Sequence, residues 1–424
     1  MNEAGQTKRR LRDAAWLTQG PLPSLLDVLS GDGEEARVAG GAVRNAVLNL
    51  PPGDIDIATT ATPEAVIRRV TQAGLRAVPT GIEHGTVTVV AAGIPFEVTT
   101  LRVDVETFGR KANVRFGRDW KADAERRDLT MNALTATADG TIHDYVGGLA
   151  DLEARRVRFI GDPAMRIAED YLRILRFFRF HAAYGEGEPD AAGLAACIAA
   201  RRGLEQLSRE RVRMELLKLL VAKGVVPALT AMADAGLLGS VLGGVPLVAS
   251  VARMTESEAA LGLAADPIRR LAALNVLVVE DAERLWQRLR LSNAEHGRLA
   301  SMGEIWWRRI APGDDGFARP WLYRLGAQHF IDRVLLAWAR AGAKPSDETW
   351  RNLATLPQRW TAPVFPLRAA DFMQRGVEQG PALGAALRAA EEAWIAADFP
   401  ADNETIGQIA TNAVEGAAKA PRNF

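Results

Sequence analysis

The amino-acid sequence predicts an α/β (α+β) head with a small mixed β-sheet, followed by an all-α neck, body and tail. Strand-like segments alternate with helical segments from about residue 35 to residue 157. Beyond Pro163 the β-branched alternation stops, and long segments rich in Ala, Leu, Arg and Glu continue to the end of the chain. With 424 residues the chain is also too long for one ordinary core, so we expect several domains.

The elements of the head are predicted from local signals, taken in chain order. A short strand at 36–38 leads into a helix at 43–50, and residues 54–57 alternate Asp and Ile as a half-buried strand does. Thr62 is expected to cap the next helix, with Pro63 at its first position. The segments 85–90 and 94–101, joined through 91–93, are expected to form a hairpin.

Composition places few further limits on the chain. A hydrophobic fraction of 48% and a charged fraction of 25% are typical of a soluble globular protein, and the formal net charge of zero neither indicates nor excludes nucleic acid. The single cysteine, Cys197, excludes an internal disulfide framework and a thiolate zinc cluster. No apolar segment is continuous enough for a secretory signal or a membrane span, so we expect a cytoplasmic protein without a membrane partner. The tryptophans of the tail, from Trp306 and Trp307 to Trp394, we interpret as packing residues.

A glycine turn is the first candidate functional feature. Gly40 and Gly41 follow the first strand and open the next helix. Adjacent glycines allow the backbone to approach phosphate oxygens, because no Cβ stands in the way. Arg44, one turn later, could then pair with a triphosphate.

Asp54 and Asp56 are the second feature. Residues i and i+2 of a strand project to the same face, so this pair would place two carboxylates together. Two close anions repel each other unless a cation joins them, and oxygen ligands of this kind suit Mg²⁺ that also binds phosphates. We therefore predict phosphoryl transfer with two Mg²⁺ ions, one activating the attacking hydroxyl and one neutralising the leaving pyrophosphate.

Four motifs in order resemble one known family. The motifs are Gly40 to Arg44 with Asp54 to Glu64, Arg126 to Ala133, Asp144 to Gly148, and Glu169 to Phe180. Together they resemble the class II CCA tRNA nucleotidyltransferase and bacterial poly(A) polymerase family, strongly over residues 35–220 and more weakly in the tail. The sequence departs from the family pattern at Asn45, where Asp is usual. Asn keeps a hydrogen-bond acceptor but loses the charge, so the metal chemistry of the aspartate pair should persist.

The resemblance assigns further residues to the site. It places Arg127 and Asn132 with the nucleotide, and Asp128 with the catalytic carboxylates beside Asp54 and Asp56. Glu97, on the second strand of the predicted hairpin, is a rival third carboxylate that we rank below Asp128.

A base-reading pair is predicted on a helix that contains Asp170 and Arg173. The carboxylate only accepts hydrogen bonds, and the guanidinium only donates them. Cytosine and adenine share an amino donor beside a ring-nitrogen acceptor, whereas uracil and guanine present a carbonyl oxygen in place of that amino group. One Asp with one Arg would therefore accept C and A, and the family reads its nucleotides with this motif. We expect Arg176 to serve the nucleotide as well, and Arg179 to face phosphate or structure.

The predicted function is an RNA nucleotidyltransferase that adds CMP and AMP, from CTP and ATP, to the 3′ end of tRNA. A poly(A) polymerase shares every motif above, and a catalytically inactive RNA-binding scaffold is the alternative from another class. Whether all three nucleotides are added, or only CC or A, stays open, and no protein partner is inferable. The domains implied are an N-terminal helical segment at 1–34, a nucleotidyltransferase head at 35–160, a nucleotide- and RNA-binding neck and body at 161–255, and a tRNA-binding helical tail at 256–424.

Overall fold

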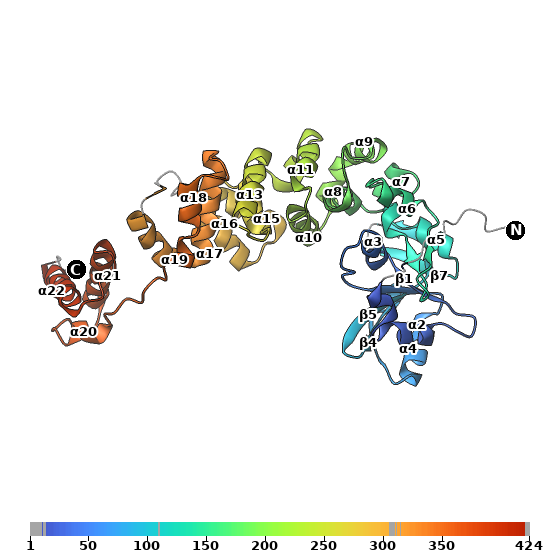
Figure 1. The fold of residues 1–424 in the computed structure, drawn as a ribbon, viewed down its shortest axis with the longest axis horizontal. Coiled ribbons are helices and arrows are strands. Elements are labelled where there is room, and N and C mark those ends of the chain that lie inside the picture. The colour runs from blue at the N-terminus through green and yellow to red at the C-terminus, as the bar shows by residue number, and fades with distance from the viewer. Residues whose placement is uncertain are drawn as a thin grey trace. The chain divides into compact units, whose positions relative to one another are not determined.

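The computed structural model describes residues 11, 14–108, 111–304, 310, 312–313 and 315–419. It divides the chain into two compact units (Figure 1). The first comprises Met1–Val248 with Gln287–Arg290, and the second comprises Ala249–Trp286 with Leu291–Phe424. Within the predicted N-terminal helical segment the structure has α1 (Ala15–Thr18) and α2 (Leu22–Leu29), while residues 1–10, 12 and 13 lie outside the described residues.

A mixed seven-stranded sheet forms the centre of the head, which confirms the predicted fold class. Its order is β3-β4-β5-β2-β1-β8-β9, and only the β2–β5 pairing is parallel. The strands are β1 (Ala36–Ala39), β2 (Asp56–Thr59), β3 (Arg76–Gly81), β4 (Thr86–Ala91), β5 (Ile94–Thr100), β8 (Thr135–Ala136) and β9 (Ile142–His143), with β6 (Arg102–Phe108) and β7 (Lys111–Phe116) as a separate hairpin.

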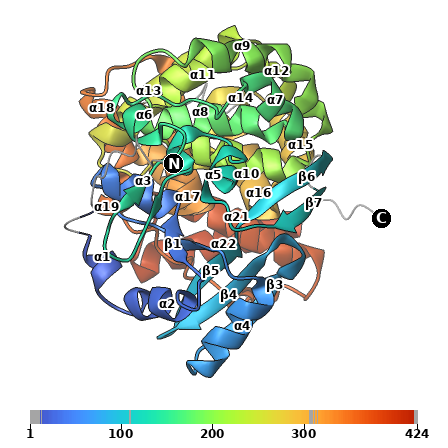
Figure 2. The same cartoon turned by 90° about the vertical axis from the view of Figure 1, so that its right-hand side faces the viewer.

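Helix α4 (Pro63–Gln72) packs on β3, β4 and β5, beside α2 (Figure 2). Thr62 caps it as predicted, since its hydroxyl accepts a hydrogen bond from the Ala65 amide at 3.4 Å. The β4–β5 hairpin is also confirmed, and its two-residue turn uses positive φ at both Ala92 and Gly93.

Two predicted boundaries in the head are wrong by a few residues. The predicted helix at 43–50 is α3 (Gly41–Val47), because the positive φ of Gly40 lets the helix begin directly after it. The predicted strand at 54–57 is β2, which begins at Asp56; Asp54 lies in a bend before the strand. Alternation of Asp and Ile therefore extends beyond the residues that pair in the sheet.

The helices that follow the sheet complete the first unit. Helix α8 contacts α10 and α11, and its Phe177 stacks on Phe159 with ring centroids 5.3 Å apart. Cys197 is buried in α9, and burial raises the pKa of its thiol to about 12, as suits a packing residue. The helices are α5 (Trp120–Glu125), α6 (Gly148–Glu153), α7 (Pro163–Glu169), α8 (Leu172–Tyr184), α9 (Ala191–Ala199), α10 (Arg209–Leu220), α11 (Val225–Asp234) and α12 (Leu237–Leu242), with 3₁₀ turns η1 (Ile82–His84), η2 (Thr130–Asn132) and η3 (Arg201–Gln206).

The described part of the second unit is helical. Trp338 and Trp394 are buried, as the packing interpretation requires, while Trp306 and Trp307 lie outside the described residues. No helix among the described residues is long and apolar enough to cross a membrane. The helices are α13 (Val248–Ala260), α14 (Pro267–Asn275), α15 (Val279–Leu289), α16 (Asn293–Gly303), α17 (Asp315–Ala341, interrupted at Gly326), α18 (Glu348–Ala354), α19 (Leu356–Arg359), α20 (Ala369–Met373), α21 (Pro381–Ala396) and α22 (Asn403–Lys419).

Candidate active site

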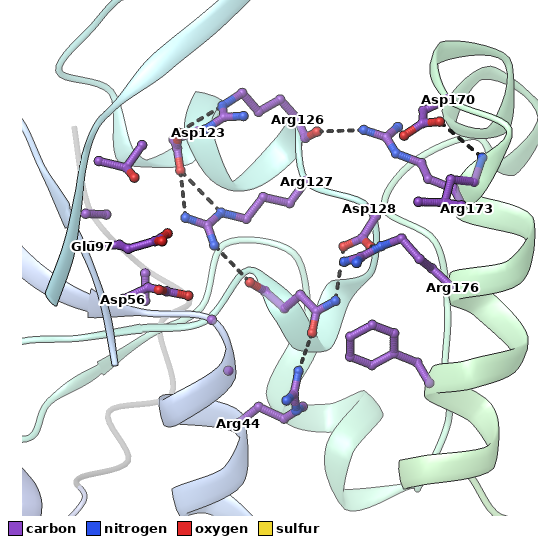
Figure 3. A pocket seen from close by; sticks show the side chains of 18 of the residues that line it. Arg44, Asp56, Glu97, Asp123, Arg126, Arg127, Asp128, Asp170, Arg173 and Arg176 are labelled. Atoms are coloured by element: carbon purple, nitrogen blue, oxygen red, sulfur yellow. Dashed lines mark hydrogen bonds and ion pairs between the residues drawn. The ribbon is translucent and has the colours of Figure 1, made fainter. Parts of the chain in front are cut away.

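A cavity of about 610 Å³ in the first unit gathers most of the predicted site residues (Figure 3). Its lining comes from the turn before α3, from β2 and β5, from the segment between α5 and η2, and from α8 and α10. The predicted residues that line it are Gly40, Gly41, Arg44, Asp56, Arg127, Asp128, Asn132, Asp170, Arg173 and Arg176. Asp54 and Arg179 are not among the lining residues.

The glycine turn closes tightly against the segment that carries Arg127 and Asn132. Gly40 has a φ of +66°, and a Cβ there would lie 3.3 Å from the Asn132 carbonyl oxygen and 3.4 Å from an Arg127 nitrogen. Only glycine fits this conformation and this space without displacing its neighbours. The turn therefore brings bare backbone to the wall of the cavity.

Arg44 is buried at the end of the cavity near α8, and its contacts are with neutral groups. Its guanidinium donates to the Asn132 side-chain oxygen at 2.6 Å, to the Asn45 side-chain oxygen at 3.1 and 3.2 Å, and to the Tyr184 hydroxyl at 2.9 Å. The guanidinium carbon also lies 4.3 Å from the Tyr184 ring centroid and 5.1 Å from that of Phe180. Burial lowers the pKa of Arg44, against the favourable influence of Tyr184.

Asp56 and Glu97 face each other across the parallel pair β2 and β5, where they occupy paired register positions (Figure 3). Loss of hydration raises the pKa of the Asp56 carboxyl, and repulsion from Glu97 and Asp54 adds to this, while Arg127 opposes it. Within the described residues neither Asp56 nor Glu97 forms an ion pair with Lys, Arg or His. Arg127 therefore offsets the charge of Asp56 only in part, and no ion pair within the described residues neutralises either carboxylate.

Asp128 has different surroundings from Asp56 and Glu97. It is buried, and its carboxylate accepts hydrogen bonds from Arg176 Nε at 2.6 Å, Asn132 Nδ2 at 3.1 Å and the Leu129 amide at 2.8 Å. Burial alone would raise its pKa, but Arg176 and these hydrogen bonds outweigh burial and lower it. Figure 3 shows Asp128 beside Arg176, away from Asp56 and Glu97. The geometry favours Glu97 over Asp128 as the neighbour of Asp56, contrary to the order predicted from the sequence.

Asp123 was not predicted, yet it orients two of the cavity arginines. Its buried carboxylate accepts from Arg126 at 2.6 and 2.9 Å and from Arg127 at 3.2 and 3.3 Å. Arg127 also donates to the Asn132 carbonyl oxygen at 3.1 Å. The spacings of three and four residues were a usable signal in the sequence, because such residues are neighbours on a helix.

The predicted base reader departs from its expected geometry. Asp170 does not share a helix with Arg173: it has extended backbone, at φ −158°, between α7 and α8. The predicted shared helix is wrong, because the chain turns sharply at Asp170. Both side chains still line the cavity, and the Arg173 amide donates to the Asp170 carbonyl oxygen at 3.0 Å.

Asp170 has a charged partner that the sequence did not reveal. Arg211 of α10 donates to both of its carboxylate oxygens, at 2.6 and 3.2 Å, and the Leu172 amide donates to Oδ1 at 3.1 Å. A carboxylate offers about four acceptor positions. One position, on Oδ2, remains for a further donor. No local pattern in the sequence indicates this pair, because 41 residues separate Arg211 from Asp170.

The remaining arginines of α8 are held by carboxylates. Arg173 pairs with Glu169 and donates to the Arg166 carbonyl oxygen at 2.9 Å. Arg179 pairs with the buried Glu215 of α10, which also lies 3.7 Å from Arg176. Arg179 thus faces α10 and supports the helix packing.

Comparisons with known proteins agree with this architecture. A family model described as the Poly A polymerase head domain matches residues 36–158, and one described as the probable RNA and SrmB-binding site of polymerase A matches residues 190–249. The chain is 36% identical over 384 residues to the mitochondrial CCA tRNA nucleotidyltransferase 1 of Mus musculus, covering 89% of this chain and 86% of the relative. It is 33% identical over 393 residues to the CCA-adding enzyme of Limosilactobacillus fermentum, covering 91% and 95% of the two chains.

Solved structures give the same result for the fold. The CCA-adding enzyme of Bacillus stearothermophilus in complex with CTP has a TM-score of 0.72 at 26% identity, covering 92% of this chain and 96% of that one. The Thermotoga maritima CCA-adding enzyme, complexed with tRNA, has a TM-score of 0.67 at 16% identity and covers 95% and 98%. At that identity the second likeness shows a shared fold.

Proposed function

The chain belongs to the CCA tRNA nucleotidyltransferase family, and from that premise we propose that it adds C, C and A to the 3′ end of tRNA from CTP and ATP. The terminal hydroxyl of the RNA attacks the α-phosphorus of the nucleotide, the bond to the bridging oxygen breaks, and pyrophosphate leaves as the hydroxyl loses its proton. The observation that carries the proposal is the neighbouring carboxylates of Asp56 and Glu97, which form no ion pair among the described residues, in a cavity with a glycine turn and six arginines.

Asp54, Asp56 and Glu97 are the residues that would hold Mg²⁺. Among the described residues no three acidic, His or Cys side chains already stand as a complete metal site. Mg²⁺ commonly uses only one or two carboxylates together with substrate phosphates, so the acidic pair fits it. Two Mg²⁺ ions, when bound, would activate the attacking hydroxyl and neutralise the leaving pyrophosphate.

The phosphate chain of the nucleotide would lie against the glycine turn. Gly40 and Gly41 leave the backbone open to phosphate oxygens, and Arg44 and Arg127 supply donors on either side of Asn132. Asp128 would act through Arg176 and Asn132 by fixing their positions rather than by binding metal.

Asp170 and Arg173 would read the base. The free acceptor position on Asp170 Oδ2 suits the amino group of cytosine or adenine, and Arg173 supplies a donor for the ring nitrogen beside it. Arg176 would support this contact from the next turn of α8. Uracil or guanine would instead present a carbonyl oxygen at this position. That oxygen has no proton to donate, and the negative carboxylate would repel it.

The head at 35–160 would perform the transfer, the neck and body at 161–255 would read the nucleotide, and the tail at 256–424 would bind tRNA. The cytoplasmic location expected from the sequence stays a prediction, since one of the relatives named above is a mitochondrial enzyme.

The test uses a tRNA that ends at the discriminator base. The purified chain is incubated with this tRNA, Mg²⁺ and each nucleotide alone or in pairs, and the 3′ ends are sequenced. We expect CC with CTP alone and CCA with CTP and ATP together. Long A tails with ATP alone would instead identify a poly(A) polymerase, and no incorporation in the presence of tight RNA binding would identify a scaffold.

A further inference from the structure

Arginines on the cavity wall are almost all neutralised by the protein itself. Five of the six that line the cavity form an ion pair with a carboxylate within the described residues. The pairs are Arg126 and Arg127 with Asp123, Arg173 with Glu169, Arg176 with Asp128, and Arg211 with Asp170. Arg44 is the sixth, and no carboxylate lies within ion-pairing distance of it in the part of the chain that is described.

A buried cation of this kind needs compensation. Arg44 is 7% exposed, and neutral amide and hydroxyl oxygens satisfy its hydrogen bonds without cancelling its charge. Asp128 favours the charged form of Arg44 only from beyond ion-pairing distance. An anion that enters the cavity would supply a direct partner, and charge-assisted hydrogen bonds between Arg and phosphate are about twice as strong as neutral ones.

Asn45 is the residue that determines this charge state. Its Nδ2 donates to the Pro51 carbonyl oxygen at 2.9 Å, which turns Oδ1 toward Arg44 and Tyr184. The same position could hold a carboxylate of equal size, which would neutralise Arg44 in place. The side-chain oxygen of Asn132 also accepts from Arg44, but its amide group donates to Asp128. A carboxylate at position 132 would therefore repel Asp128.

We propose that Asn45 sets the affinity of the cavity for the phosphate chain of the nucleotide, because it holds Arg44 in position without neutralising it. This inference rests on the proposed function. Asn45 is a positioning residue: it acts through Arg44 and makes no contact with the base reader on Asp170. Its effect should therefore be equal for CTP and ATP.

The test compares Asn45→Asp with Asn45→Ala. Both variants lose the hydrogen bond to Pro51. Asn45→Asp keeps an acceptor for Arg44 and adds a negative charge, whereas Asn45→Ala removes that acceptor and leaves Arg44 charged. Weaker phosphate binding by Asn45→Asp than by Asn45→Ala therefore reports the added charge. Asn49→Asp is the matched control: Asn49 is exposed, lies four residues later, and has a φ of +56° that Asp also tolerates. Dissociation constants are measured for CTP, ATP and inorganic triphosphate, together with the melting temperature.

We expect Asn45→Asp to bind all three ligands roughly ten- to a hundredfold more weakly than Asn45→Ala, the range for a hydrogen bond to a charged group. The ratio of CTP to ATP binding should not change, and the melting temperature of Asn45→Asp should exceed that of Asn45→Ala. Asn49→Asp should bind as the wild type does. Equal triphosphate affinity in the two Asn45 variants would overturn the inference while CCA addition by the wild type still stood. Failure of the wild type to add nucleotides would refute the proposed function, and binding of inorganic triphosphate would still decide the role of Asn45.

Discussion

Acidic residues on two walls of the cavity differ in whether arginine side chains pair with them. On the sheet wall, formed by β2 and β5, Asp56 and Glu97 face each other without an ion pair among the described residues, and the pKa of Asp56 is raised by lost hydration and by its acidic neighbours. On the helical wall, formed by α8 and α10 together with Asp128 and Asp170, both of these acids bind arginine.

This difference separates two kinds of work that the same side chains can do. Two crowded carboxylates without a partner favour a bound cation, since a cation removes the repulsion between them. Carboxylates that already pair with arginine have less capacity for metal, and they orient their partners instead. Residue type alone does not distinguish the two walls; the partner of each acid does.

The largest expected effect on activity comes from substitutions of the proposed metal-binding residues. Asp54→Ala and Asp56→Ala should each reduce incorporation of both CMP and AMP by at least about a thousandfold, because metal ions contribute several kcal/mol to such transition states. Single-turnover incorporation into tRNA measures the loss, and circular dichroism checks that the fold persists. Near-native turnover in either variant would remove that residue from the metal site.

Glu97→Gln and Asp128→Asn test the contrast between the walls directly. Glu97→Gln should lower kcat by about a hundredfold or more with little change in nucleotide affinity, since it removes a carboxylate that binds metal. Asp128→Asn should instead weaken nucleotide binding, because Arg176 loses its charged partner. If Asp128→Asn has the larger kcat loss, Asp128 is the third catalytic carboxylate and the division between the walls is wrong.

Substitutions on the helical wall should change base selectivity, whereas substitutions on the sheet wall should not. Asp170→Ala removes the acceptor for the amino group of C and A, and also the repulsion that excludes U and G, so the preference for CTP over UTP should fall roughly ten- to a hundredfold. Arg173→Ala should weaken CTP and ATP together. Competition between nucleotides on a tRNA primer measures both ratios. Full discrimination in Asp170→Ala would place the base reader elsewhere in the chain.

Arg211→Met should have a smaller effect of the same kind. Arg211 orients the Asp170 carboxylate through two hydrogen bonds, so its loss should reduce the preference for CTP over UTP by roughly three- to tenfold. Arg211→Lys should recover only part of that preference, because lysine cannot make the paired contact. Unchanged selectivity with a normal melting temperature would mean that Arg211 serves packing alone.

The smallest effect concerns stability. The pKa of Asp128 is lowered in the folded chain, so the charged carboxylate contributes stability above the ordinary value of 3.8, and this contribution is lost as the pH falls through the lowered value. Asp128→Asn should therefore be less stable than the wild type by about 1–3 kcal/mol at pH 7. Urea unfolding from pH 7 to pH 3 should show this difference shrinking at the acid end. A constant difference would indicate that the ionisation of Asp128 does not contribute.

Local patterns in the sequence predicted much of the head correctly. Thr62 with Pro63 marks the start of α4, and the hairpin from β4 to β5 is set by the residues in and beside its turn. The glycine turn at Gly40 needs a positive φ, which few other residues adopt easily. Each of these features depends on residues a few positions apart, so the sequence itself displays them.

The amino-acid sequence by itself thus determined which side chains are available and where helices and turns begin, because those preferences are set by near neighbours. Only the tertiary structure decided which acidic side chains pair with arginine and which lie beside another acid. Asp170 meets Arg211 across 41 residues, Asp128 meets Arg176 across 48, and Glu97 reaches Asp56 only through the parallel pairing of β2 with β5. Such pairings depend on how the sheet and the helices pack, and the charge of a residue carries no information about the partner it will meet.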